Sequence, residues 1–348
     1  MIRNKTVFII SCLLSAGMFV LWFTMLAGTD APRVWRGFLI NYLFFISLAG
    51  GMVVWPAIII AAHGEWMHPV EFVSRTGFAF SVPSVIALIA LWAGSPAWAP
   101  WIHASADKQW WLNNTFLFSR NLVALVVFWL VAFWFSRNRS GKKRRVAAGW
   151  LVFTYAITFS LTGFDFVMAL EPEWDSMMTG GYFFISGLYL AVAAWTFLSL
   201  LLGSGEAKVL HDLGKLIVAF CMLTAYLMFC HLLPVWYENM PEETIFLLPR
   251  MNLAWKNVSY ALLILIYIGP LLLLLPAWTK QNRIYMAFIS FMVMVGMWIE
   301  RWWLVSAVFE KNRILFGWGE VVPALAFLGL MTAGIIYSLK KQTRVSQQ

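Results

Sequence analysis

Ten long apolar stretches decide what this chain can fold into. At 1.5 Å of rise per residue, a helix of about 20 apolar residues crosses a hydrocarbon core of ~30 Å. The stretches cover residues 7–27, 37–62, 77–95, 115–135, 146–170, 181–203, 214–237, 257–276, 284–305 and 320–338. They predict an all-α, polytopic membrane protein whose 348 residues form a single integral membrane domain.

The composition agrees with a membrane protein. Hydrophobic residues make up 61% of the chain and charged residues only 12%, whereas a soluble domain carries about 25% charged residues. The net charge of +9 could suggest a nucleic-acid partner. However, the charges lie in short loops between the apolar stretches, so we expect a bilayer and no nucleic acid.

The positions of the basic residues predict the orientation. Of 25 Lys and Arg residues, 16 fall on the side that holds both termini, 8 on the other side, and Arg120 within a stretch. The positive-inside rule therefore places both termini and the basic 136–145 loop in the cytoplasm. The first stretch, after Arg3 and Lys5, exceeds the usual ~7–15 residues of a signal peptide, so we expect a retained helix. Cleavage near Ala27 is the alternative.

The connections between the stretches are short. Neighbouring helices should therefore form antiparallel pairs packed as bundles, and the two longest gaps, 96–114 and 238–256, are expected to be loops. Pro83, Pro234 and Pro270 fall within stretches, where proline should kink the helix or free a backbone carbonyl.

Five ionisable residues on four stretches are expected at similar depth, in the outer third of the bilayer. They are Arg120, Asp165, His231, Glu300 and Arg301. An ionised group in hydrocarbon costs about 3 kcal/mol or more, so such residues usually serve a function.

The stretch that carries Asp165 also carries a polar stripe. Tyr155, Thr158, Thr162 and Asp165 are spaced three, four and three residues apart, which puts them on one helix face. Hydroxyl groups leading from mid-membrane to a carboxylate predict a proton path. Alternatively, Asp165 and Arg120 form a buried ion pair that only fixes helix packing.

Thr224 and His231 are seven residues apart and share a second face. A histidine near an acid could bind and deprotonate a quinol hydroxyl. The alternative is that His231 only bonds a carbonyl freed by Pro234. Glu300 and Arg301 could contribute to the same site, or extend to the membrane interface.

The chain offers few ligands for a redox centre. Two b-type haems need four histidines within helices, and only His231 lies well within a stretch. Cys12, Cys221 and Cys230 are scattered and form no CxxC pair. No P-loop, no GxGxxG after a strand and no HExxH occurs. We therefore expect this chain to bind no metal, haem or iron–sulfur cluster.

Three sequence blocks are similar to a known family. HDLGKLIVAFCMLTAYLMFCHLLPVWYENMPEET (211–244), FDFVMALEPEWDS (164–176) and WWLNNTFLFSRN (110–121) resemble, in the same order, blocks of the ActF subunits of bacterial alternative complex III. These belong to the NrfD/PsrC-like integral membrane proteins, and the similarity runs from about residue 35 to 305. The chain departs from the family pattern at Phe166, Glu173, Thr224 and His231, where that pattern has Trp, His, Trp and Gln.

The resemblance implies ten helices, arranged as two four-helix bundles plus two peripheral helices, in a bacterial inner membrane. It implies a quinol:cytochrome c oxidoreductase complex that uses menaquinol or ubiquinol. Haem c and iron–sulfur clusters would lie on partner subunits: an iron–sulfur protein and multihaem and monohaem cytochromes c. A sister membrane subunit, NrfD- or ActC-like, is usually assigned the quinol site, and ActF a proton path.

Three hypotheses follow. The first is a membrane subunit of such a complex, with a proton-conducting or quinol-facing site formed by Asp165, His231, Arg120 and the threonine stripe. The second is a structural anchor for periplasmic redox subunits. The third, a secondary transporter, is weakened because no helix interruption recurs in two halves of the chain.

Overall fold

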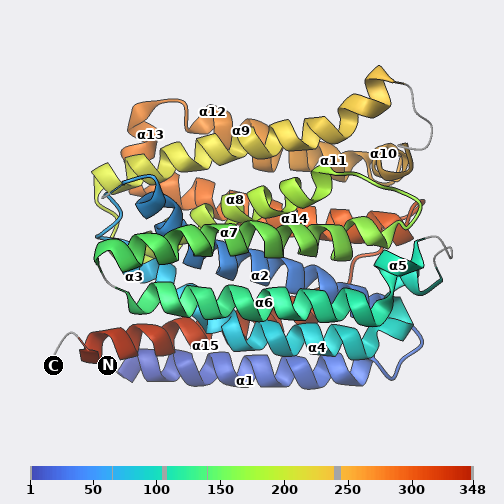
Figure 1. Cartoon of the computed structure of the whole chain (residues 1–348), viewed down its shortest axis with the longest axis horizontal. Helices are drawn as coiled ribbons and strands as arrows, with labels where there is room; N and C mark the ends of the chain where they lie inside the picture. Colours follow the sequence, from blue (N-terminus) through green and yellow to red (C-terminus); the bar gives the residue numbers. More distant parts are fainter. Residues whose placement is uncertain (1, 65, 104–107, 139, 239–243, 346–348) are drawn as a thin grey trace.

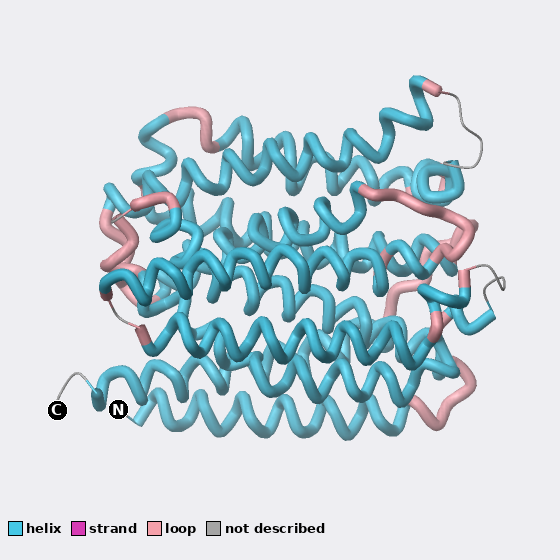
Figure 2. The backbone as a smooth tube through the Cα atoms, viewed as in Figure 1, coloured by secondary structure: helices cyan, strands magenta, loops and turns pink. Residues whose placement is uncertain are grey.

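The computed structural model describes residues 2–64, 66–103, 108–138, 140–238 and 244–345. All regular secondary structure in these ranges is helical (Figure 2). Ten helices are long and apolar enough to cross a membrane. The prediction of an all-α, polytopic membrane protein is confirmed.

The ten spans match the ten predicted stretches. Seven are single helices: α1 (Ile2–Met25), α2 (Ala31–Ala61), α6 (Asn114–Arg137), α8 (Met178–Leu201), α9 (Ala207–Tyr237), α14 (Arg283–Phe309) and α15 (Trp318–Val345). Three are composite: α3 (Glu71–Ser74), η1 (Arg75–Phe80) and α4 (Ser81–Trp98); α7 (Gly141–Phe166) and η3 (Met168–Leu170); and α11 (Lys256–Leu262), η5 (Leu263–Ile268) and α12 (Gly269–Leu273). Short helices are η2 (Pro100–His103), α5 (Gln109–Leu112), α10 (Thr244–Met251) and α13 (Ala277–Gln281).

The spans pack as two four-helix bundles and one peripheral pair (Figure 1). Helices α2, α4, α6 and α7 each contact the next and close the first bundle. Helices α8, α9, the α11–α12 span and α14 close the second. The terminal helices α1 and α15 pair with each other beside the first bundle, as the resemblance implied.

Helix α2 lies at the centre, where small residues let helices approach closely. A Cβ atom added at Gly51 of α2 would lie 2.5 Å from the Cβ atom of Ala191 of α8. Close by, the indole N–H of Trp55 donates to the carbonyl of Leu188 at 3.0 Å. Close backbone approach of this kind is the usual basis of helix association in lipid. It joins the two bundles.

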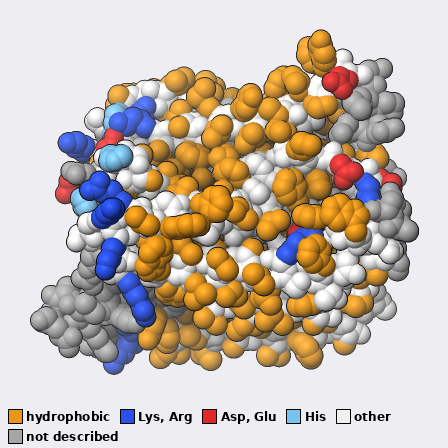
Figure 3. Space-filling model, in the orientation of Figure 1, with side chains coloured by type: hydrophobic (Ala, Val, Ile, Leu, Met, Phe, Trp, Pro, Cys, Tyr) orange, Lys and Arg blue, Asp and Glu red, His pale blue; other side chains and the backbone are white. Residues whose placement is uncertain are grey.

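Charged side chains gather at the two ends of the molecule, separated by a broad apolar band (Figure 3). The end that holds both termini is rich in Lys and Arg (Figures 1 and 3). There, Arg75 and Arg144 both donate to Glu71, at 2.8 and 2.7 Å. We call the opposite end, with α5 and α10, the outer end, because the positive-inside rule assigns the basic end to the cytoplasm.

A turn of π-helix marks the eighth span. Segment η5 is π-helical and ends at Ile268, two residues before Pro270. Pro270 has no N–H to donate to the carbonyl four residues earlier, that of Ile266. The hydroxyl of Tyr189 donates to that carbonyl instead, at 2.9 Å. The predicted effect of Pro270 is therefore confirmed, and the freed carbonyl has a partner in the other half of its bundle.

Two other local expectations were wrong. Pro83 lies in the first turn of α4, where a helix tolerates proline because the missing N–H has no intrahelical acceptor. The two long gaps are not only loops: η2 and α5 lie within 96–114, and α10 lies within 238–256 and presents Arg250, which is 1% exposed. A short helix with a buried arginine gives no long apolar run, so hydropathy alone could not reveal it.

The orientation predicts which exposed positions are reached from outside. In a background with Cys12 and Cys230 changed to serine, a cysteine at Glu173 should react with a membrane-impermeant thiol reagent in intact cells. A cysteine at Ser140 should react only after the cells are opened. Both positions are exposed, so access decides the result. Labelling of Ser140→Cys in intact cells would contradict the assignment of the basic end.

Candidate functional site

Asp165 is fully enclosed by partners from α6. Its side chain is 0% exposed. Arg120 donates from Nε to one carboxylate oxygen at 2.8 Å and from a terminal nitrogen to the other. The amide of Asn121 donates to the first oxygen at 2.5 Å. Both oxygens are therefore occupied, which is the bidentate geometry of a strong arginine–carboxylate pair.

Arg120 is held equally firmly. It donates from its other terminal nitrogen to the carbonyl of Trp111 at 2.8 Å, and its guanidinium lies 3.9 Å from the ring centre of Trp111. This contact is a cation–π interaction. Asp165 and Arg120 thus form the buried ion pair of the second alternative. With Trp111, the pair connects α6, α7 and α5 at the outer end.

The polar stripe on α7 is buried as predicted, but its hydroxyl groups do not hydrogen-bond to one another. Thr162 donates to the carbonyl of Thr158 at 2.9 Å, and Thr158 to the carbonyl of Ala124 at 3.2 Å. Tyr155 donates to the carbonyl of Phe184 at 3.1 Å. Each hydroxyl proton therefore goes to a backbone acceptor, which favours helix packing over a continuous proton path.

A second polar cluster lies in the other bundle, around Glu300. Tyr182 of α8 donates to one oxygen of Glu300 at 2.6 Å, and Arg301 donates to the other at 2.6 Å. Arg301 also donates to the hydroxyl of Ser186 at 2.8 Å. The hydroxyl of Tyr267 lies 3.4 Å from that of Tyr182. Two phenols and one carboxylate thus form a chain of oxygen atoms.

Glu300 and Arg301 are 1% and 0% exposed. The alternative in which these two side chains extend to the membrane interface was therefore wrong. Both side chains have hydrogen-bond partners within the bundle: Tyr182 of α8 donates to Glu300, and Arg301 donates to Ser186 of α8. Sequence reasoning missed Tyr182 and Tyr267, whose tyrosine type is common in apolar helices and gives no signal without the structure.

These oxygen atoms face a cavity of about 200 Å³, which we call the aromatic pocket. It is lined by Tyr182, Met228, Leu232, Phe246, Leu247, Arg250, Met251, Ser259, Tyr260, Leu262, Leu263, Ile266, Tyr267, Glu300 and Trp303. Exposed Tyr260, Leu263 and Met251 form its rim. An apolar cavity with a few converging polar groups is the usual form of a small-molecule site.

The π-helical segment η5 forms part of the pocket wall. Leu263, Ile266 and Tyr267 of this segment all line the cavity. Single turns of π-helix inside α-helices are frequent at functional sites, since they displace side chains from the regular helical positions. Here, the turn carries the phenol of Tyr267 to within reach of Tyr182.

His231 lies beside the aromatic pocket. Its Nε2 atom is 3.3 Å from the hydroxyl of Thr179, and its ring centre is 5.6 Å from that of Tyr182. Its Nδ1 atom is 2.9 Å from the carbonyl of Leu227, four residues earlier. Pro234 frees the carbonyl of Cys230, four residues before it, and not that of Leu227. The alternative that His231 bonds a carbonyl freed by Pro234 was therefore wrong.

Thr224 shares the buried face of α9 with His231, as predicted. Its hydroxyl donates to the carbonyl of Phe220 on the same helix, at 2.6 Å. It therefore adds no polar link between the predicted residues. The structure brings Glu300 together with two tyrosines and His231, and it brings Asp165 together with Arg120 in the other bundle.

Arg250 closes the aromatic pocket at the outer end. It donates to the carbonyls of Phe246 and Leu304, at 2.6 and 2.8 Å. Its terminal nitrogen lies 3.7 Å from a carboxylate oxygen of Glu171. Burial lowers the pKa of Arg250 to about 10, and Glu171 opposes that change, so the guanidinium keeps its charge at neutral pH.

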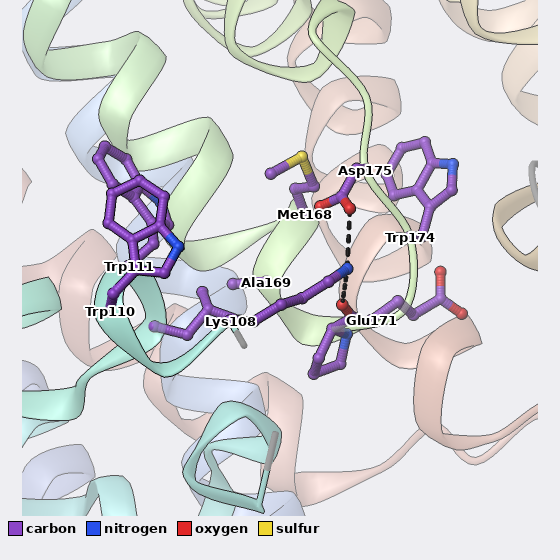
Figure 4. Close-up of a pocket in the computed structure, with 10 residues that line it drawn as sticks. Lys108, Trp110, Trp111, Met168, Ala169, Glu171, Trp174 and Asp175 are labelled. Atoms are coloured by element: carbon purple, nitrogen blue, oxygen red, sulfur yellow. Dashed lines mark hydrogen bonds and ion pairs between the residues drawn. The ribbon is translucent and has the colours of Figure 1, made fainter. Parts of the chain in front are cut away.

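A second cavity, of about 230 Å³, lies at the outer end next to Glu171 (Figure 4). We call it the outer pocket. It is lined by Lys108, Trp110, Trp111, Leu112, Met168, Ala169, Glu171, Pro172, Trp174 and Asp175. Lys108 donates to the carbonyl of Pro172 at 2.7 Å and to Asp175 at 2.8 Å.

The residues that the structure describes contain no group of three or more His, Cys, Asp or Glu side chains able to hold a metal ion. The free cysteines lie apart: Cys12 is exposed, Cys221 buried and Cys230 half-buried. The thiol of Cys221 donates to the carbonyls of Ile266 and Tyr267, at 3.4 and 3.2 Å. Its environment is that of a packing residue.

The ion pair in the first bundle can be tested by a double-mutant cycle. Asp165→Asn strands the charge of Arg120, which should cost roughly 3–5 kcal/mol and lower the yield of folded protein. Adding Arg120→Gln should restore much of that loss, because no charge is then left unpaired. The measurement is thermal stability in detergent. A stable Asp165→Asn variant with no coupling to Arg120 would contradict a structural ion pair.

Comparison of the chain with models of known protein families and with curated proteins found no significant match. The family resemblance of the three sequence blocks therefore supports a proposal and no more. The geometry of the aromatic pocket is the structural observation that bears on function.

Proposed function

We propose that this chain is an integral membrane subunit of a respiratory quinol oxidoreductase complex of the alternative complex III type, with the aromatic pocket facing the quinol. The observation that carries the proposal is the placement of Glu300, Tyr182 and Tyr267 at one cavity within membrane-spanning helices. The resemblance of the three sequence blocks supports the same class of complex.

The pocket fits the chemistry of a hydroquinone. A quinol presents two phenolic hydroxyl groups on a flat apolar ring, and its oxidation releases two protons and two electrons. Phe246 and Trp303 offer aromatic walls, and the carboxylate of Glu300 offers a proton acceptor, either directly or through Tyr182. A general base must lie within hydrogen-bond reach of the proton that it takes. Menaquinol and ubiquinol share this chemistry.

Two guanidinium groups, those of Arg250 and Arg301, adjoin the proposed quinol site. Arg301 donates to Glu300 from inside the bundle, and Arg250 lines the cavity on the outer side. With Glu171 beside Arg250, the two guanidinium groups face two acids, so a proton taken up by Glu300 gives the cluster one net positive charge. Electrons would leave to partner subunits: an iron–sulfur protein and cytochromes c beside a sister membrane subunit, in a bacterial inner membrane.

Asp165 suits this role less well than Glu300. Both carboxylates accept at both oxygen atoms. However, Asp165 accepts from Arg120 and Asn121 and lines neither pocket described above, whereas one donor to Glu300 is the phenol of Tyr182, which faces the aromatic pocket. A carboxylate held by a bidentate arginine and an amide is fixed in place and offers little room for a further hydrogen-bond donor. We therefore assign Asp165 to the architecture of the first bundle.

A structural anchor is the second candidate function. The closed pairs at the outer end favour it: Arg33 donates to both oxygens of Glu320 at 3.0 Å, and Arg120 holds Asp165. Such pairs would keep the outer face rigid for docking of partner subunits. In that case the aromatic pocket would contribute nothing to turnover.

The two functions differ in the effect of Glu300→Gln. If the pocket faces quinol, loss of the base should slow quinol oxidation by the native complex about 10²–10⁴-fold. Glu310→Gln is the matched control, because Glu310 is also buried, follows the last turn of the same helix and lies outside the pocket. The measurement is quinol oxidation in membranes, with subunit content checked on each preparation.

Tyr267→Phe provides a second variant in case Glu300→Gln disturbs Arg301. It removes one hydroxyl that belongs to no ion pair and leaves the aromatic wall in place. We expect a higher KM for quinol and a slower rate with normal assembly. Wild-type kinetics in both Glu300→Gln and Tyr267→Phe would reject the quinol site and favour the anchor.

A further inference from the structure

Glu171 lies between the two pockets. Its side chain lines the outer pocket, and one of its oxygens is 3.7 Å from Arg250, which lines the aromatic pocket. It follows η3, directly after the end of the fifth span. The residue is 6% exposed, so it is more buried than its place at the end of a span suggests.

An aromatic stack forms the rest of the wall between the pockets. Trp174 faces the outer pocket and Phe246 the aromatic pocket, and their rings stack with centres 4.4 Å apart. The guanidinium of Arg250 lies 3.8 Å from the ring centre of Phe246. The ring of His231 lies against both aromatic rings, with its centre 6.0 Å from that of Trp174 and 5.7 Å from that of Phe246. Arg250 and Glu171 meet at the same wall and form a polar connection through it.

One oxygen of Glu171 is unused. Its Oε1 atom is buried and has no hydrogen-bond partner among the described residues. Figure 4 shows the carboxylate pointing away from the Lys108–Asp175 pair, on the side of Trp174. A buried carboxylate oxygen without a donor is costly. Such an oxygen is free to bind a proton or a water molecule.

The surroundings of Glu171 favour its protonated form more than water does. Burial raises the pKa of Glu171 above the usual value for glutamate, while the charges of Arg250 and Lys311 oppose that change. Lys108 and Asp175 line the same outer pocket but are paired with each other. Of the described charged groups around Glu171, only the cations Arg250 and Lys311 act against its protonation.

We infer that Glu171 is a proton-transfer residue, which accepts the proton released in the aromatic pocket and passes it to water in the outer pocket. This inference rests on the proposed function, since quinol is the source of the proton. Arg250 acts as a positioning residue, because its guanidinium holds one oxygen of Glu171 and leaves the other to exchange.

The proton transfer is balanced as follows. The O–H bond of a donor in the aromatic pocket, quinol or the protonated Glu300, breaks, and a water molecule beside Arg250 carries the proton across. An O–H bond forms at Glu171, whose negative charge is neutralised. That bond then breaks as water in the outer pocket takes the proton, and the carboxylate is restored. No electron moves in these steps.

The pH profile of quinol oxidation tests the inference. Glu171 must be ionised to accept a proton, so the wild-type rate should fall as the pH drops through its pKa. Glu171→Gln should slow turnover on the order of 10²-fold and remove this acid limb. Glu171→Asp should keep the limb with an intermediate rate. Glu173→Gln, an exposed carboxylate two residues away, should behave as the wild type.

A wild-type rate and an unchanged acid limb in Glu171→Gln, with quinol oxidation intact, would overturn the inference and leave the proposed function standing. The second readout needs no turnover: infrared spectroscopy of the purified chain in detergent. A carboxylic acid band that titrates with pH and disappears in Glu171→Gln, but not in Glu173→Gln, supports proton exchange at this residue. A Glu171 that stays ionised at every pH in the folded chain overturns it.

Discussion

Every buried carboxylate in the described part of the chain lies within 4 Å of an arginine, and the rest of the structure depends on this pairing. Glu71, Asp165, Glu171, Glu300, Glu310 and Glu320 are all 9% exposed or less. Their partners are Arg144, Arg120, Arg250, Arg301 and Arg33, the last shared by Glu310 and Glu320. An unpaired ion among apolar helices costs about 3 kcal/mol or more, so pairs between different spans, such as Arg120 of α6 with Asp165 of α7, fix which helices must be neighbours.

The pairs differ in what donates to their carboxylate oxygens and in whether they adjoin a cavity. Asp165 accepts from Arg120 and Asn121 and lines neither pocket. Glu300 also binds a phenol that faces a cavity, and Glu171 keeps one oxygen without a donor. The first arrangement stabilises one packing of α6 against α7. The other two leave groups that can exchange protons, and both adjoin a pocket. This contrast separates architecture from function within one set of buried charges.

The sequence predicts the ten spans well, because they follow from hydropathy and from 1.5 Å of rise per residue. It predicted that Asp165 and Glu300 lie in the outer third of the bilayer, and left open whether Asp165 pairs with Arg120. It could not predict that Tyr182 and Tyr267 meet at Glu300, because that contact depends on how the α11–α12 span rotates at its π-turn. Arg250 and Glu171 fall outside the predicted stretches, and the sequence does not reveal their burial, since a short helix and a bent loop that fold back onto the bundle show no periodic apolar pattern.

The central claim, that quinol occupies the aromatic pocket, is tested most directly by locating a bound quinone. The purified chain would be illuminated with a photoreactive quinone analogue, and the labelled peptides identified by mass spectrometry. Labelling should concentrate on residues 244–267 and on the outer half of α14, and excess unmodified quinone should suppress it. Label confined to the open groove between α6 and α7, which Arg120, Val123 and Thr158 help to line, would contradict the claim and place the quinone in the other bundle.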